Sequence, residues 1–116
     1  MAPITLELQK DTSSNGTTTI YHAKGKLSLE TVNGFVQHLR PDTSPRLILD
    51  LSAVSFLDSA GVGALVSLFV SRRSQGQSLA LAALAPQAKA VVMVAGLHSM
   101  LPMYGTVEEA AAGKKS

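Results

Sequence analysis

The stretch Arg46–Phe69, RLILDLSAVSFLDSAGVGALVSLF, decides the fold of this chain. Its apolar run Leu47–Leu51 is typical of a central strand that is covered on both faces of a sheet. A polar turn is expected next, and the following apolar pattern predicts a helix over Ser59–Ser74, with Asp58 as its N-cap. One hydroxyl group, that of Ser59, is therefore expected at a helix start that carries almost no bulky side chains.

Strands and helices are predicted to alternate on both sides of this stretch. The patterns predict strands over 4–8, 17–23, 47–51, 79–84 and 101–104, and helices over 29–39, 59–74, 86–95 and 107–112. Asn15 and Gly16 form the strongest short hairpin signal, and Gly25 is expected to end the second strand. The segment 79–84 has helical propensity, but its place between two helices favours a strand. This order, β-β-α-β-α-β-α-β-α, predicts an α/β fold with a partly parallel sheet.

The helix boundaries follow from residues with known capping preferences. Ser28 is placed to cap the first helix, and Pro41 is placed to end it. Pro86 suits the first position of the third helix, and Gly96 suits the position just after that helix. Thr106 begins the capping-box sequence TVEE, which predicts the start of the last helix.

Length and composition indicate one ordered domain. The 116 residues leave no room for a second core, and the predicted elements cover about 4–112, with 113–116 as a disordered tail. The formal net charge is only +2 and the basic pairs at 72–73 and 114–115 are isolated, which argues against nucleic-acid binding. The chain has no cysteine. It shows neither a signal-peptide pattern nor an uninterrupted apolar run of membrane length, so a cytoplasmic protein without membrane insertion is expected.

The central motif also resembles that of a known family. A hydrophobic strand, the sequence DSAG at 58–61 and a helix of small residues are together similar to the signature of the STAS domain, named after sulfate transporters and anti-sigma factor antagonists. The resemblance extends from Ile4 to about Ala112. It implies a single STAS domain at 1–116, with a mixed sheet of about five strands and about four helices mainly on one side.

The chain looks like a free-standing bacterial anti-sigma factor antagonist. The resemblance implies that the unphosphorylated protein binds an anti-sigma factor serine kinase, a histidine-kinase-like ATPase, and so releases a sigma factor. Phosphorylation at the position of Ser59 would break the complex, and a PP2C-type phosphatase would restore it. No cofactor is implied, because ATP would be a ligand of the partner. A STAS subunit of a stressosome-like scaffold or of a lipid-transport ATPase complex is the alternative within the same fold.

The chemistry of a helix start agrees with a phosphoserine switch at Ser59. The first N–H groups of a helix have no intrahelical partner and favour negative charge. A docked partner would have to desolvate the phosphate, and burying an unpaired charge costs several kcal/mol. An ordinary capping serine is the alternative on local chemistry alone. The expected partner-binding residues are Asp58, Ser59, Ala60, Gly61, Val62 and Gly63.

The two glycines of this segment allow two interpretations. A glycine inside a helix costs roughly 0.5–1 kcal/mol relative to alanine, so Gly61 and Gly63 indicate that another group approaches closely. That group is either the protein's own sheet or a docked partner. Both interpretations hold if the two glycines face different sides of the helix.

One position departs from the family's pattern. Many antagonists of this type carry Asp just after the Gly-x-Leu that follows the second strand, whereas here Gly25, Lys26 and Leu27 are followed by Ser28. In the family that Asp lies near the phosphorylated serine. Recognition by the kinase is therefore the property that this change would affect.

A catalytic role for Ser59 is the alternative from another functional class. A nucleophilic serine needs a base and an oxyanion hole, but His22, His38 and His98 are isolated in the sequence. Leu57 occupies the first glycine position of a G-x-S-x-G motif. The glycines of the helix start lack the third glycine of a dinucleotide-binding pattern, and metal-ligand spacings are missing. A non-enzymatic interaction protein is the expected function.

Overall fold

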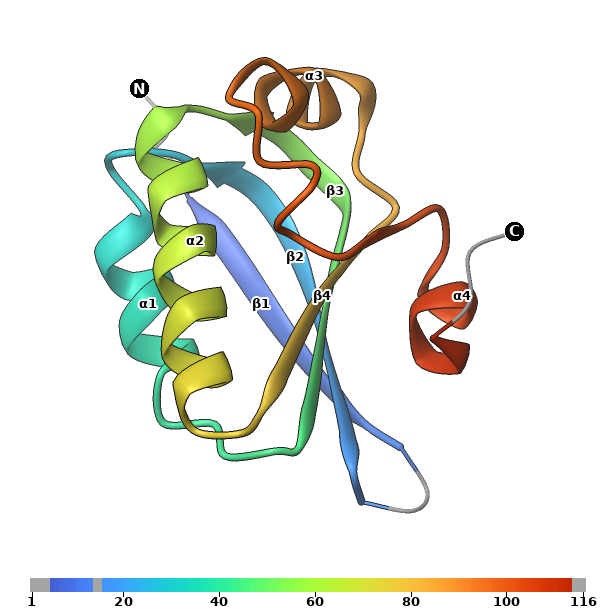
Figure 1. Cartoon of the computed structure of the whole chain (residues 1–116). Coiled ribbons are helices and arrows are strands. Elements are labelled where there is room, and N and C mark those ends of the chain that lie inside the picture. The colour runs from blue at the N-terminus through green and yellow to red at the C-terminus, as the bar shows by residue number, and fades with distance from the viewer. Residues whose placement is uncertain (1–4, 14–15, 114–116) are drawn as a thin grey trace.

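The computed structural model describes residues 5–13 and 16–113 of the chain (Figure 1). The elements are β1 (Leu6–Thr12), β2 (Thr18–Leu27), α1 (Val32–Leu39), β3 (Arg46–Leu57), α2 (Ser59–Ser74), β4 (Ser78–Ala82), α3 (Pro86–Val94), β5 (Met103–Tyr104) and α4 (Val107–Ala112). This order confirms the predicted alternation of strands and helices. Three predictions concern residues outside the described ranges: Ile4 as the start of the first strand, Asn15 in the hairpin turn, and residues 114–116 of the disordered tail.

The strands form one mixed sheet of five strands in the order β1-β2-β3-β4-β5. Strands β1 and β2 form an antiparallel hairpin, in which Leu8 lies opposite Ala23. Strands β2 to β5 run parallel to one another, so each connection between them crosses over through a helix. The predicted mixed α/β sheet is confirmed, with β3 at its centre.

Helices α1, α2 and α3 pack on one face of the sheet, and α4 lies on the other side (Figure 1). The larger core lies beneath the first three helices and includes Phe35, Leu65 and Val92. A smaller core beneath α4 includes Ile48 and Ala110. Strand β3 therefore contributes buried residues to both faces, as expected for a central strand.

Arg72 holds the C-terminal end of α2 in place. Its buried side chain donates hydrogen bonds to the backbone carbonyls of Asp42, Ser44 and Ser78. The guanidinium Nη1 also lies 3.8 Å from the Asp42 carboxylate, which accepts a 3.3 Å hydrogen bond from the Tyr21 hydroxyl. A buried guanidinium is tolerated here because its charge and its donors have partners. This network ties α2 to the segment before β3 and to the first residue of β4, and so fixes the direction in which α2 points.

The structure corrects several predicted strand ends: β1 continues to Thr12, β4 ends at Ala82, β5 begins at Met103, and β2 and β3 are both longer. Gly25 does not end the second strand, because β2 continues to Leu27 through two irregularities in its pairing with β3. Gly25 has a φ of 122°, and a Cβ at this position would lie 2.3 Å from the carbonyl oxygen of Thr5. The segment after Leu51 that was expected to be a polar turn is strand instead, since β3 continues to Leu57. The longer β3 carries the chain directly to the start of α2.

The first helix begins later than predicted, at Val32 rather than Leu29. The prediction that Ser28 is its N-cap is wrong: the N-cap is Thr31, and the Ser28 hydroxyl donates a hydrogen bond to Glu30 instead of accepting one from a helix N–H. The Ser28 carbonyl accepts 2.9 Å hydrogen bonds from the N–H groups of Thr31 and Val32, which form a turn in front of the helix. Leu29 lies in this turn and is 71% exposed.

The other helix boundaries are confirmed. Asp58 caps α2, Pro86 is the first residue of α3, and Gly96 follows α3 with a φ of 73°. The Thr106 hydroxyl oxygen accepts a 3.0 Å hydrogen bond from the N–H of Glu109, as the capping-box sequence predicted. None of the helices in the described part of the chain has both the length and the apolar character that crossing a bilayer requires.

Candidate functional site at the start of helix α2

Ser59 is the first residue of α2 and follows the central strand after a single residue. Its side chain is exposed, while its neighbours Asp58 and Ala60 are half-buried. Val62 is buried beneath them, and Gly63 is exposed. The six residues predicted to bind a partner thus form one continuous helix start, and the serine hydroxyl lies at its surface.

Asp58 fixes this helix start through both of its carboxylate oxygens. Oδ1 accepts a 2.9 Å hydrogen bond from the N–H of Gly61, which satisfies one of the free donors of the first turn. Oδ2 accepts a 3.1 Å hydrogen bond from the N–H of Leu29, in the turn before α1. The same carboxylate therefore joins the start of α2 to the turn that follows β2. The first bond was predicted from the sequence, and the second was not.

Gln87 holds the end of β3 from the other side. Its side-chain amide accepts a 2.9 Å hydrogen bond from the N–H of Leu57 and donates a 3.0 Å hydrogen bond to the Leu57 carbonyl. Gln87 is the second residue of α3, so this pair of bonds attaches the start of α3 next to Asp58. Nothing in the sequence around Gln87 indicated this contact.

The two glycines of the helix start have different surroundings. A Cβ at Gly61 would lie 2.4 Å from the carbonyl oxygen of Leu27 and 2.6 Å from a methyl group of Leu57. Gly61 is therefore required for packing on the protein's own backbone. A Cβ at Gly63 would meet no other atom within 4 Å, and this residue faces the outside. The glycines thus face different sides of the helix: the close approach of the protein's own sheet is confirmed at Gly61, and contact of Gly63 with a partner stays a prediction.

A shallow apolar hollow of about 400 Å³ adjoins Ser59, between α2 and α3. Its lining residues are Ser59, Val62, Ala90, Val91, Val94 and Ala95. Val94 at the end of α3 is 89% exposed, and the adjacent Met93 is 43% exposed. The serine hydroxyl is the polar side-chain group in this otherwise apolar lining. The contribution of α3 was not predicted, since it depends on how the two helices meet in space.

Ser28, which stands where many antagonists carry Asp, is buried near this site. Its hydroxyl donates a 2.8 Å hydrogen bond to the exposed carboxylate of Glu30. The next residue, Leu29, is the one whose N–H binds Asp58. A carboxylate is therefore present in this turn, two residues later than the family's pattern places it.

The three histidines occupy other parts of the molecule. His22 pairs with Asp50, His38 packs its ring edge-to-face on Tyr21 at 5.8 Å, and His98 lies after α3. Within the described residues, no hydrogen bond joins a histidine to Ser59, and no group of three His, Cys, Asp or Glu residues is arranged to hold a metal ion. The described residues therefore place no histidine base in hydrogen-bond contact with the Ser59 hydroxyl.

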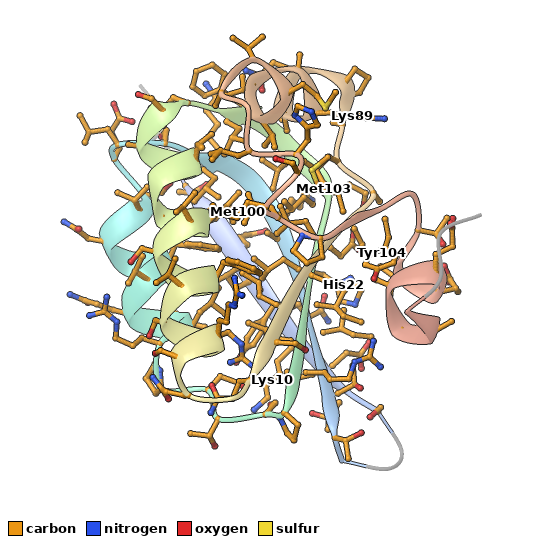
Figure 2. All side chains as sticks on the ribbon, in the orientation of Figure 1. Lys10, His22, Lys89, Met100, Met103 and Tyr104 are labelled. Atoms are coloured by element: carbon orange, nitrogen blue, oxygen red, sulfur yellow. The ribbon has the colours of Figure 1, made fainter. Side chains whose placement is uncertain are left out.

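His22 belongs to a separate polar cluster on the sheet face that carries α4 (Figure 2). Its Nδ1 lies 2.6 Å from the Asp50 carboxylate, and its Nε2 lies 3.5 Å from the Asp11 carboxylate. The hydrogen bond to Asp50 raises the pKa of His22, against a smaller opposite effect of burial. Burial favours the protonated form of Asp50, but hydrogen bonds from His22 and Ser52 outweigh it and lower the pKa of Asp50.

We predict that His22→Gln destabilises the protein at about pH 5.5 and has a much smaller effect at about pH 9. The pKa of His22 is raised on folding, so the stability that its proton contributes is complete below the unfolded pKa of about 6.5 and is lost as the pH rises through the folded pKa. The effect at the lower pH should reach at most about 1 kcal/mol, because the pair is partly exposed. Urea unfolding of both proteins at both pH values measures it, and an equal loss at both would contradict the prediction.

Comparison with known proteins identifies the class of domain that this fold and helix start define. The sequence of residues 9–110 matches the family model of the STAS domain. The matched region covers most of the chain, from β1 to α4. The protein therefore belongs to the STAS domain family.

Solved structures with the same fold include several anti-sigma factor antagonists. One from Mycobacterium paratuberculosis is 22% identical, covers 97% of this chain and 96% of its own, and has a TM-score of 0.83. The antagonist SpoIIAA in its unphosphorylated form is 20% identical over 92% of this chain and 95% of its own, with a TM-score of 0.76. The phosphorylated form of SpoIIAA, from Bacillus, keeps the similarity at a TM-score of 0.70. The fold also occurs within the larger SLC26A9, where the match covers 19% of that chain.

Proposed function

We propose that this protein is an anti-sigma factor antagonist whose partner-binding surface is switched by phosphorylation of Ser59. The observation that carries the proposal is the exposed Ser59 hydroxyl at a capped helix start, on the rim of an apolar hollow. Membership of the STAS family and the likeness of the fold to free-standing antagonists support this role.

The start of α2 can carry a phosphate without losing its structure. A phosphoserine adds about −1.5 to −2 charges, and the free N–H groups and the dipole of a helix start stabilise negative charge. Repulsion from Asp58 acts in the opposite direction, but both carboxylate oxygens of Asp58 already accept hydrogen bonds. The serine side chain is exposed, so water can solvate the remaining charge. Phosphorylation should therefore change the surface and leave the fold intact.

The same phosphate would prevent a partner from covering the hollow. An apolar surface binds by excluding water, and a charge on its rim would have to be desolvated together with it. Asp58, Ser59, Ala60, Val62 and Gly63 then form the part of the surface contributed by α2. Gly61 supports this surface from within, because it packs against the backbone of the protein itself.

The proposed cycle follows from this switch. In the cytoplasm, the unphosphorylated antagonist binds an anti-sigma factor serine kinase, a histidine-kinase-like ATPase, and a sigma factor is released. The kinase uses its own ATP to phosphorylate Ser59, which dissociates the complex, and a PP2C-type phosphatase restores the antagonist. This chain contributes the docking surface and the acceptor hydroxyl, and it needs neither a catalytic site nor a nucleic-acid contact for this role.

Phosphorylation in the presence of the kinase tests the proposal. The partner is first captured from the native host with the intact chain, and then incubated with the chain and ATP. Mass spectrometry should find one phosphate, on Ser59, and none on Ser59→Ala. Ser59→Ala should keep full affinity for the kinase, while Ser59→Asp should bind at least tenfold more weakly, a difference of about 1.4 kcal/mol.

Two outcomes would overturn the assignment. Phosphate on Thr12, Ser13 or Ser55, with Ser59 unmodified, would place the acceptor elsewhere. Capture of a transporter ATPase in place of a kinase would assign the chain to a different STAS role. Thermal unfolding of Ser59→Ala and Ser59→Asp serves as the control, since both side chains are exposed and the melting temperatures should agree within a few degrees.

A further inference from the structure

We infer that a second hollow, between the β4–α3 connection and β5, binds a small organic anion that has an apolar body. The hollow has a volume of about 320 Å³, which lies in the range of small-molecule sites. Its lining includes Ala83, Leu84, Lys89, His98, Met103 and Tyr104. It shares none of these residues with the hollow beside Ser59, so the two are separate sites.

The position in the fold favours a ligand site. Strands β4 and β5 are parallel, and the hollow lies at their carboxyl ends, where α/β sheets commonly bind ligands. Ala83, the residue after β4, has a φ of 58°, a left-handed conformation that is costly for a residue with a Cβ. Its N–H donates a 2.9 Å hydrogen bond to the carbonyl of Tyr104, which fixes the backbone in this conformation. Such strained residues concentrate at ligand sites.

The lining of the hollow contains one formal charge, that of the exposed Lys89, and the imidazole of the exposed His98. It includes no carboxylate. In the described part of the chain, the side chains of Lys89 and His98 have no hydrogen-bond or ion-pair partner. Helix α3 starts three residues after Ala83, and its first turn has neither an acidic residue nor a side-chain cap, so the positive end of its dipole is not neutralised. Gly105 also lines the hollow, and a Cβ built there would lie 3.2 Å from the Glu109 carboxylate, which accepts a 3.3 Å hydrogen bond from the Thr106 hydroxyl. Lys89 and the uncapped start of α3 together favour an anion.

The remaining lining residues supply apolar surface. Leu84, Met103 and Tyr104 contribute aliphatic, thioether and aromatic groups. In Figure 2, Lys89, Met103 and Tyr104 follow one another along the side of the molecule between α3 and α4. A carboxylate or a phosphate monoester on a ring or a short aliphatic chain would therefore place its charge near Lys89 and its body against Met103 and Tyr104.

Titration of the full chain with four probes tests this site by amide chemical shifts. Phenyl phosphate and benzoate combine charge with a ring, inorganic phosphate has no apolar body, and benzyl alcohol has no charge. Saturable shifts at Ala83, Leu84 and Gly105 with phenyl phosphate or benzoate, and weaker binding of the other two probes, would support the site.

Matched lysine variants separate this site from general attraction of anions. Lys89→Gln should weaken binding of the tighter probe about tenfold, because a charge-assisted contact is lost. Lys10→Gln removes the same charge from β1, far from the hollow in Figure 2, and should leave the affinity unchanged. Equal affinity of both variants, or equal binding of benzyl alcohol, would overturn the inference. Kinase binding is not part of this test, so its result is independent of the proposed function.

Discussion

Replacing the exposed Val94 by glutamate should weaken binding of the proposed kinase partner at least tenfold, which corresponds to about 1.4 kcal/mol. Val94 is 89% exposed in the free protein and lines the hollow beside Ser59. A partner that covers the hollow would bury the new carboxylate without a counter-charge, at a cost of several kcal/mol. Calorimetric titration of the unphosphorylated protein with the kinase gives the change in affinity.

Val70→Glu provides the matched control for this prediction. Val70 is also an exposed valine on a helix, with 54% of its surface accessible, but it lies toward the other end of α2. The two variants introduce the same charge, and both should melt within a few degrees of the natural protein. Equal affinities of the two variants would place the hollow outside the interface.

Gly61→Ala should destabilise the protein by about 1–3 kcal/mol, whereas Gly63→Ala should stabilise it by about 0.5–1 kcal/mol. At Gly61 the added methyl group would lie 2.4 Å from the carbonyl oxygen of Leu27, so the helix start and the end of β2 must move apart. At Gly63 the methyl group meets no other atom within 4 Å, and alanine is the better helix former.

Thermal melting tests the two glycine variants directly, because they add the same group two residues apart. A loss of about 2 kcal/mol at Gly61 corresponds to a fall of roughly 10 °C in melting temperature for a domain of this size. Stabilisation by both substitutions would refute the close packing of Gly61. The kinase affinity per folded Gly63→Ala molecule then reports whether the bare, exposed side of the helix start contacts the partner.

The start of α2 could be predicted from the sequence because its determinants are adjacent in the chain. Asp58 is next to the helix that it caps, and the periodicity of the following residues defines that helix. The order of strands and helices was predictable for the same reason. The ends of β2 and β3 were not, since the pairing of β2 with β3 continues through irregularities that local residue preferences do not reveal.

The parts of the site that depend on tertiary contacts could not be predicted. The second hydrogen bond of Asp58 reaches Leu29 in another connection, and Gln87 reaches Leu57 from another helix. The apolar hollow exists only because α2 and α3 pack side by side. The 89% exposure of Val94 depends on how α3 packs against the rest of the protein, which its local sequence does not specify.

The two hydrogen bonds between Gln87 and Leu57 have a consequence for how quickly a partner can bind. With Asp58 fixed on one side and Gln87 on the other, the backbone that presents Ser59 is held in place before any partner arrives. Association then requires no ordering of this segment, so little conformational entropy is lost there on binding. Orientation of two preformed surfaces should limit the association rate constant, which for such encounters is about 10⁵–10⁷ M⁻¹s⁻¹. For the proposed switch at Ser59, differences in affinity between the phosphorylated and unphosphorylated forms should accordingly arise mainly in the lifetime of the complex.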